Sequence, residues 1–377
     1  MGNLPSWARY VFDLAAAQGV FLSFFLLTSR RNHRANLLLS TLAFAMAVGI
    51  FVPRWLFSVL QGLPPHTVNF LDISPYLFGP LLYLYVRQLT RQGFRWSRHW
   101  LHFLPFLVML KVLIPFYMIP PQQKHDAIAS LLVNPVDVKL AYLLVATQFG
   151  HTLIYTVLSL RCLKSFNQRL QAQFSNLDKV NLIWLTSLCW GFASLLCLIM
   201  LLSLLSFSGI DFRFPLNLYY SLGLATFLYL IAFFALRQQQ ILFPNPEKEK
   251  YRAASLSAMD LDRHIEPLLA LMKEEKPYLE NELSLSDLAT RAKIPEHHLS
   301  QLLNDRLKQN FYGFINRYRL EEACALLSDP EKNHLTILAI AFQAGFNNKV
   351  SFNKVFKERE KCTPSAFRRR QCGRNST

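Results

Sequence analysis

Charged side chains are scarce in this sequence, and those that are present favour one sign. Asp, Glu, Lys and Arg make up 17% of the 377 residues, whereas soluble proteins contain about a quarter. Hydrophobic residues make up 52%, and 40 basic residues against 24 acidic ones give a net charge of +16. This balance is typical of a membrane protein with basic loops, of a nucleic-acid-binding protein, or of both.

Sequence motifs for chemistry are also missing. There is no Gly-rich phosphate loop, no HExxH and no GxSxG, and the six cysteines form no CxxC or Cys/His metal spacing. His297 and His298 are neighbours on an expected helix, so they cannot both face one metal ion. We therefore expect no enzyme activity, no metal and no cofactor, and we expect the cysteines to be reduced.

Long apolar runs fill the first two thirds of the chain. A helix needs about 20 mostly apolar residues to cross the hydrocarbon core. The first run is not preceded by a basic cluster, so we expect it to be a retained helix rather than a cleaved signal peptide. The stretch 192–207 is apolar nearly all round, which disfavours a soluble helical core. The pattern predicts an all-α membrane bundle of seven spans, at residues 8–28, 35–59, 70–90, 99–119, 138–160, 181–205 and 215–236.

Basic residues alternate between the connecting loops. The second, fourth and sixth loops are nearly neutral, whereas the first, third and fifth are basic. Lys and Arg are retained on the cytoplasmic side of a membrane, so the N-terminus is predicted outside and the C-terminus inside. Losing one span would break this alternation. The basic loops carry Arg30, Arg31 and Arg34; Arg91, Arg95 and Arg98; and Arg161, Lys164, Arg169 and Lys179.

A change of composition follows the last apolar run. Pro244 and Pro246 break the helix that leaves the membrane, and a charged stretch follows. Apolar residues at helical spacing then predict an amphipathic helix over 259–274. We therefore divide the chain into a transmembrane bundle (1–236), which is the expected sensor, a cytoplasmic linker (237–281) and a C-terminal domain (282–377).

Two helix-turn-helix patterns occupy the C-terminal domain. Ser284 with Asp287 is a capping pair for the first pattern, and Thr336 caps the second. Gly345 supplies the turn of the second pattern, and Asn310 can cap a longer connecting helix. That helix would span about 25 Å at 1.5 Å per residue. The expected helices are residues 285–292, 296–307, 311–327, 336–344 and 347–358.

These residues resemble the AraC-type DNA-binding domain. The likeness lies in residues 285–289 and 299–304, in FINRYR, and in IAFQAGFNNKVSFNKVFK followed by TPSAFRR. It covers roughly 282–370 and is specific, because two helix-turn-helix patterns occur with this connecting helix. A weaker likeness, in GPLLYLYVRQLT and HFLPF, connects the membrane region with that of some AraC-type regulators. The resemblance implies a bacterial regulator in the inner (cytoplasmic) membrane, with its DNA-binding domain in the cytoplasm.

The resemblance implies that double-stranded DNA is a partner, with one recognition helix in each of two successive major grooves about 34 Å apart. From Lys349 to the end, nine basic residues stand against two acidic ones. A basic tail can also be a solvated end or contact a membrane surface, but beside these motifs phosphate binding is favoured. The expected base contacts are His297, Ser300, Gln301, Asn304, Asn348, Lys349, Val350 and Lys354. The expected phosphate contacts are Ser351, Lys357, Arg368, Arg369 and Arg370.

One residue departs from the family pattern. Lys361 stands where the family often has Gly. A left-handed turn costs a non-Gly residue roughly 1 kcal/mol more, so we expect this turn to be remodelled.

Polar residues in the apolar runs are candidates for a sensor pocket, because intramembrane ionisable residues are functional candidates by default. Hydrogen bonding between helices and snorkelling remain alternatives. The leading hypothesis is a one-component sensor that couples a small-molecule or protein signal to transcription, with a homodimer as an open alternative to a monomer. A transporter or channel with an accessory DNA-binding tail is the second hypothesis. The candidate pocket residues are Asp13, Arg54, Asp72, Gln148, His151 and Asn217.

Overall fold

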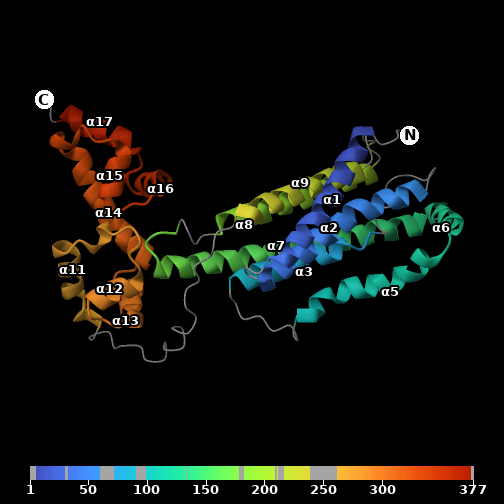
Figure 1. Ribbon diagram of the computed structural model, residues 1–377, viewed down its shortest axis with the longest axis horizontal. Helices are drawn as coiled ribbons and strands as arrows, with labels where there is room; N and C mark the ends of the chain where they lie inside the picture. The colour runs from blue at the N-terminus through green and yellow to red at the C-terminus, as the bar shows by residue number, and fades with distance from the viewer. Residues whose placement is uncertain are drawn as a thin grey trace. The chain divides into compact units, whose positions relative to one another are not determined.

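The computed structural model describes residues 6–29, 33–59, 72–90, 99–133, 135–177, 182–208, 210, 216–237 and 261–374. These residues form helices and no named strand, which confirms the all-α prediction, and one isolated antiparallel bridge pairs Phe174 with Ser284. The chain divides into two compact units (Figure 1). The first comprises Met1–Lys164 and Leu182–Gln238, and the second comprises Ser165–Asn181 and Gln239–Thr377.

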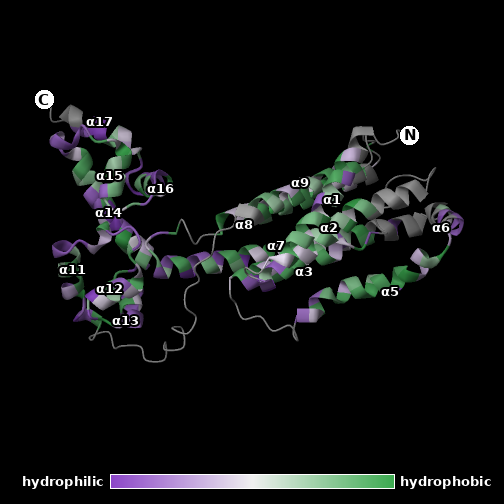
Figure 2. Cartoon of the chain, in the orientation of Figure 1, coloured by the Kyte–Doolittle hydropathy of each residue, from purple (hydrophilic) through white to green (hydrophobic). Residues whose placement is uncertain are grey.

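Mostly apolar helices build the first unit, and Figure 2 shows hydrophobic residues along much of α5, α8 and α9, whereas α6 is largely hydrophilic. Large apolar side chains are exposed on them, for example Phe21 at 70%, Trp190 at 61% and Met118 at 79%. No described side chain of α5 is buried. The elements are α1 (Ser6–Thr28), α2 (His33–Val59), α3 (Pro75–Leu89), η2 (Trp100–Phe103), α5 (Leu104–Met118), α6 (Pro121–Val133), α7 (Pro135–Gln173), α8 (Ile183–Phe207) and α9 (Leu216–Arg237).

Five helical segments in the described part are long and apolar enough to cross a membrane. They overlap the first, second, fourth, fifth and sixth predicted spans, although His33–Phe51 begins two residues before its predicted span and Leu143–Gln173 extends beyond residue 160. The third predicted span contains α3, which has only 15 residues and buries most of them in the bundle. The seventh contains a shorter apolar helix, Leu218–Phe234. The count of seven and the orientation therefore stay predictions. The five segments are Tyr10–Thr28, His33–Phe51, Trp100–Met118, Leu143–Gln173 and Ile183–Leu205.

Two helices differ from the sequence interpretation. The expected neutral loop after the fourth span contains α6, and α7 continues to Gln173 instead of ending at residue 160. The extension lacks Pro and Gly and is rich in Leu, Arg, Lys and Gln, all of which are good helix formers. It also has an apolar side, because Leu163, Phe166 and Leu170 are buried.

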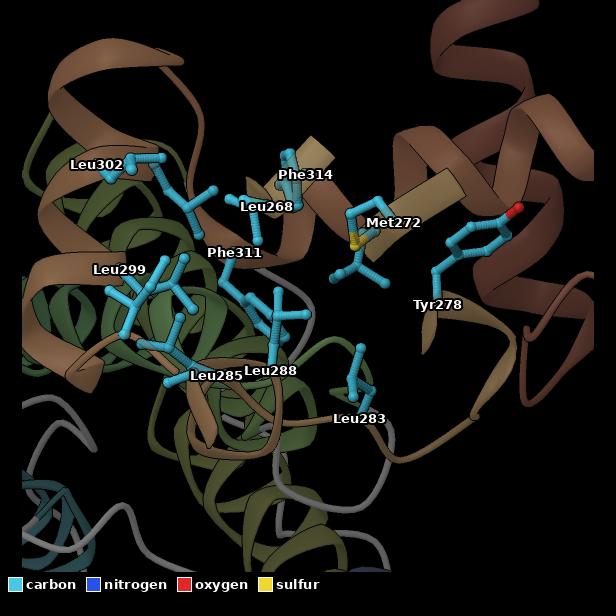
Figure 3. Close-up of a cluster of buried hydrophobic side chains, with 14 of the residues drawn as sticks. Leu268, Met272, Tyr278, Leu283, Leu285, Leu288, Leu299, Leu302, Phe311 and Phe314 are labelled. Carbon is cyan, nitrogen blue, oxygen red and sulfur yellow. The ribbon is translucent and has the colours of Figure 1, made fainter. Parts of the chain in front are cut away.

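The second unit holds two small cores connected by one long helix. Figure 3 shows the first core, in which Leu268 and Met272 of α11 lie among Leu288, Leu299 and Phe314. The predicted linker helix thus packs into this core. The elements are α11 (Ile265–Glu274), η4 (Pro277–Leu279), α12 (Leu285–Arg291), α13 (Glu296–Gln301), η5 (Leu302–Arg306), α14 (Phe311–Ser328), η6 (Pro330–Lys332), α15 (Ile337–Gln343), α16 (Lys349–Glu360) and α17 (Pro364–Arg374).

Helix α14 contributes to both cores. Phe311, Phe314 and Ile315 belong to the first core, whereas Leu320, Ala323 and Leu327 belong to the second, which also contains residues of α15 and α16. An 18-residue helix is about 27 Å long at 1.5 Å per residue. Because each half of α14 is buried in a different core, the helix holds the two motifs at a fixed separation.

Local capping in the second unit follows the sequence. Ser284 and Asp287 form the capping box, the Asn310 side chain accepts from Gly313 N, and the Thr336 side chain accepts from Ala339 N. Gly345 adopts a φ of 88°, as a turn of this kind requires.

The expectation for Lys361 is wrong. Lys361 adopts the left-handed conformation at φ 55°, ψ 14°, so the turn is kept despite the missing Gly. Its Nζ donates to Glu358 O at 2.6 Å, and this bond offsets part of the backbone cost.

Candidate nucleic-acid interface and membrane pocket

The first recognition helix is α13, continued by the single wider turn η5. Leu299 and Leu302 are fully buried and fix its inner side. The expected base contacts occupy the remaining positions: Ser300 and Gln301 are half-buried, and Asn304 is exposed. Asn304 Nδ2 donates to Ser300 O at 2.9 Å, so this side chain lies along its own helix. His297, also half-buried, packs its ring 4.0 Å from that of His298.

The second recognition helix is α16. Phe352 and Phe356 are fully buried beneath it. Lys349 and Lys354 are exposed, and Val350 is 78% exposed. A solvent-exposed Val at this place suits contact with a thymine methyl group, and exposed lysines suit guanine or phosphate.

Asn348 and Ser351 lie at the start of α16. Asn348 is its N-cap, and the side-chain oxygen accepts from Ser351 N at 2.7 Å. Asn348 therefore sets where the helix begins, which limits its freedom to read a base. Ser351 is half-buried, and Lys357 is exposed further along the helix.

The expected phosphate-binding arginines of α17 separate into two kinds. Arg369 and Arg370 are exposed. Arg368 is half-buried and its Nη1 donates to Leu335 O at 2.8 Å. Its Nε and Nη2 are also buried, without a partner in the described part. Arg368 thus ties α17 to the start of the second motif, and its position favours a structural role.

Arg319 is a functional candidate that the sequence reasoning missed. It lies in α14 and is 1% exposed. Its Nε donates to Tyr278 O at 2.7 Å, and its Nη2 donates to Glu280 O at 2.7 Å. Burial lowers the pKa of Arg319 to about 10. The sequence could have indicated that Arg319 is buried, because Arg319 lies four residues after Ile315 and four before Ala323, and both are fully buried on the same helix face.

The segment directly after α7 contacts this arginine. Ser175, 2% exposed, accepts from Arg319 Nη2 at its side-chain oxygen (3.2 Å) and from Nη1 at its carbonyl (3.3 Å). Ser175 Oγ donates to Leu283 O at 2.5 Å. Asn310 Nδ2 donates to Gln171 Oε1 at 3.2 Å. The segment expected as a free cytoplasmic loop is therefore built into the second unit.

Two of the predicted sensor residues line one cavity in the first unit. Asp72 and Gln148 are 3% and 2% exposed, and Gln148 Nε2 donates to Asp72 O at 2.8 Å. Asp13 is exposed on α1 and does not line this cavity. Arg54 and Asn217 lie in α2 and α9, and their side chains are outside the described part. The lining is completed by Pro75, Val145, Phe149, Ile199, Ser203, Leu216 and Tyr220.

His151 belongs to a separate aromatic group in the same unit. Its ring lies edge-on to Tyr76 and Tyr155, with ring centroids 5.4 and 4.9 Å away. Tyr155 OH is 2.8 Å from His102 Nδ1, and His102 Nε2 is 3.3 Å from His99 Nδ1. The sequence interpretation included only His151 of this group, because its members lie far apart in the chain.

Metal binding has no visible basis in the described part, where no group of three or more His, Cys, Asp or Glu side chains is close enough to hold an ion. The described cysteines are free.

Comparison with known proteins identifies the class of the C-terminal domain. Residues 288–370 match the family described as "Helix-turn-helix domain". This match covers the first motif from the middle of α12, α14 and the second motif, and it confirms that the second unit contains a helix-turn-helix domain. No solved structure matches the chain.

Several similar regulators each match about a quarter of the chain. An uncharacterized HTH-type transcriptional regulator of Staphylococcus aureus (strain COL) is 34% identical over 91 residues, which is 24% of this chain and 12% of the relative. The HTH-type transcriptional regulator GlxA of Rhizobium meliloti is 29% identical over 103 residues, or 27% and 31% of the two chains. The regulatory protein PocR of Salmonella typhimurium is 30% identical over 99 residues, or 26% and 31%. The matched region thus spans less than a third of each relative.

Proposed function

We propose that this protein is a membrane-bound DNA-binding transcriptional regulator, a one-component sensor whose helix bundle perceives a signal and whose AraC-type domain binds a promoter. One observation carries the proposal: one chain combines five helical segments able to cross a bilayer with two helix-turn-helix motifs on a shared helix. The family match over residues 288–370 and the similarity to transcriptional regulators support the DNA-binding part.

Lipid contact explains the exposed apolar surface of the first unit. No residue of the 19-residue segment Trp100–Met118 is buried, and large side chains such as Leu107 and Val112 are 48% and 62% exposed. Soluble monomers rarely expose a contiguous apolar patch of more than a few hundred Å². In a bilayer the same apolar side chains would contact the hydrocarbon chains of the lipids instead of water. We propose seven spans, with the N-terminus outside and the helix-turn-helix domain in the cytoplasm.

Helix α7 is the proposed route from the membrane to DNA. It is continuous from Pro135 to Gln173, and its residues pass from the first unit into the second at Ser165. The segment after it holds Arg319 through Ser175. Arg319 lies on the helix shared by both motifs, so a shift of α7 would reach the element that sets their separation.

Topology and DNA binding can be tested on the full chain. A reporter active only outside the cytoplasm should be active when fused after Val133 and inactive when fused after Gln171. The reverse pattern would overturn the orientation. Promoter selection with the full chain in lipid nanodiscs should then recover a site with two half-sites about one helical turn apart. Recovery of no preferred sequence would overturn the regulatory function.

A further inference from the structure

The cavity lined by Asp72 contains a buried acceptor that the described side chains do not fully satisfy. Asp72 Oδ1 accepts from Ser74 N at 2.9 Å and the Ser74 hydroxyl lies beside the carboxyl group, but Asp72 Oδ2 is buried without a hydrogen bond of good geometry in the described part. The Tyr220 hydroxyl, which also lines the cavity, is buried and unpartnered as well. Buried polar atoms are nearly always hydrogen-bonded, so two unpartnered oxygens lining one cavity leave a place for a donor.

The chemistry of the lining restricts that donor. Asp72 is the only carboxylic acid, and no basic residue is present, among the described side chains that line the cavity. An unpaired carboxylate away from water carries a large desolvation cost, which a cation offsets. The rings of Phe149 and Tyr220 meet edge to face with centroids 6.1 Å apart, and aromatic faces attract cations, ammonium groups in particular.

The remaining lining residues distinguish an organic cation from a metal ion. Val145, Ile199 and Leu216 are apolar and suit an alkyl group. A bare metal ion would instead need several oxygen ligands around it. Ser203 Oγ already donates to Ile199 O at 2.8 Å, so it can only accept from a ligand. The free space is small, about that of one water-sized group, which limits the occupant to the head of a molecule whose remainder lies outside the cavity.

We propose that this cavity binds the ammonium group of a small amine, with Asp72 Oδ2 and Tyr220 OH as acceptors and the Phe149 and Tyr220 rings beside the cation. In the proposed sensor, the signal would therefore be a small amine. This identification of the signal rests on the proposed function. Because Asp72 lies just before α3, Gln148 and Phe149 lie in α7 and Tyr220 lies in α9, an occupant would connect three helices. One of these, α7, ends at Gln173, two residues before Ser175.

Thermal unfolding of the full chain in nanodiscs tests the site, with ethylammonium chloride as the probe. Ethanol is the neutral comparison, and potassium chloride keeps the ionic strength constant. The unfolding midpoint should rise in a saturable way with ethylammonium alone. The Asp72→Asn variant should need at least tenfold more ethylammonium for the same rise, since Asn keeps the acceptor for Ser74 N but loses the charge. Asp126→Asn, which removes a carboxylate that is 78% exposed on α6, should behave as the original chain does.

Three results would overturn the proposal: no saturable rise, an equal rise with potassium chloride, or an undiminished rise in Asp72→Asn. If Asp72→Asn does not fold, Tyr220→Phe decides, because it removes an acceptor and keeps the ring. It should weaken the effect several-fold, and an unchanged effect would contradict the site. Promoter activity separates this inference from the function. If ethylammonium binds but transcription does not change, the amine site stands and the sensing function is contradicted. If the membrane region regulates transcription but no amine binds, the sensing function stands and the amine site is contradicted.

Discussion

Replacing Arg319 by Ala should destabilise the helix-turn-helix unit more than any exposed substitution. The guanidinium makes two short bonds of 2.7 Å to the carbonyls of Tyr278 and Glu280. It makes two longer bonds to Ser175. A hydrogen bond to a charged group contributes about 1.5–3 kcal/mol, so the two short bonds alone correspond to about 3–6 kcal/mol. The loss of stability in Arg319→Lys should be smaller than in Arg319→Ala but still measurable, because one ammonium group cannot reproduce the planar arrangement of donors.

Hydrogen exchange of the α14 backbone amides in the full chain measures this loss, because it reports the free energy of local opening. A loss of 3 kcal/mol corresponds to exchange that is about a hundredfold faster. Arg317 is the matched control. Its guanidinium lies 5.0 Å from the Tyr318 ring centroid and 4.0 Å from Glu321, contacts worth about 1 kcal/mol at a partly exposed site. Arg317→Ala should change exchange by less than about tenfold. If Arg319→Ala changes it no more than that, the buried carbonyls find other donors and the reasoning fails.

Further substitutions test the DNA-binding face and its support. Replacing Arg369 and Arg370 by Ala should weaken binding to all sequences and flatten the salt dependence by up to about 0.9 log unit per lost phosphate contact; an unchanged slope would assign them elsewhere. Gln301→Ala should relax preference at one end of the selected site and Lys349→Ala at the other, each by about 1–3 kcal/mol; a retained consensus would contradict base contact. Gly345→Ala should destabilise the second motif by more than about 1 kcal/mol, because the new methyl group would strike the backbone of Tyr278 at a φ of 88°; unchanged exchange in α15 would contradict this.

The features that the sequence predicted well are local ones. Capping by Ser284, Asn310 and Thr336 depends on side chains within three residues of the bonded amide. The apolar runs likewise identify five candidate spans without knowledge of packing. By contrast, most residues of the 15-residue helix α3 are buried in the bundle, and hydropathy alone does not distinguish a buried helix from a lipid-facing one.

The features that the sequence missed depend on contacts between distant residues. Arg319 finds its acceptors about 40 residues before it and at Ser175, 144 residues away. The good helix formers of residues 161–173 favour a helix there, but the partner of its apolar residues lies far away in the sequence, so the basic charge alone suggested a free loop. At Lys361 the family pattern favoured Gly, yet the helix ends in the left-handed conformation anyway. Tertiary packing of α16 and α17 can offset roughly 1 kcal/mol of backbone cost. The preference for Gly in a left-handed turn does not include this packing free energy.

The arrangement of the second unit explains why a signal would act on α14 rather than on a recognition helix. Each recognition helix packs on a core of its own, and α14 is the element that both cores share. A change confined to one core would alter one half-site. Arg319 sits between Ile315 of the first core and Ala323 of the second, so displacing its partner Ser175 would act on the junction itself. Reading two successive grooves requires both helices in register, and the proposed coupling through α7 therefore acts where a small shift affects both contacts at once.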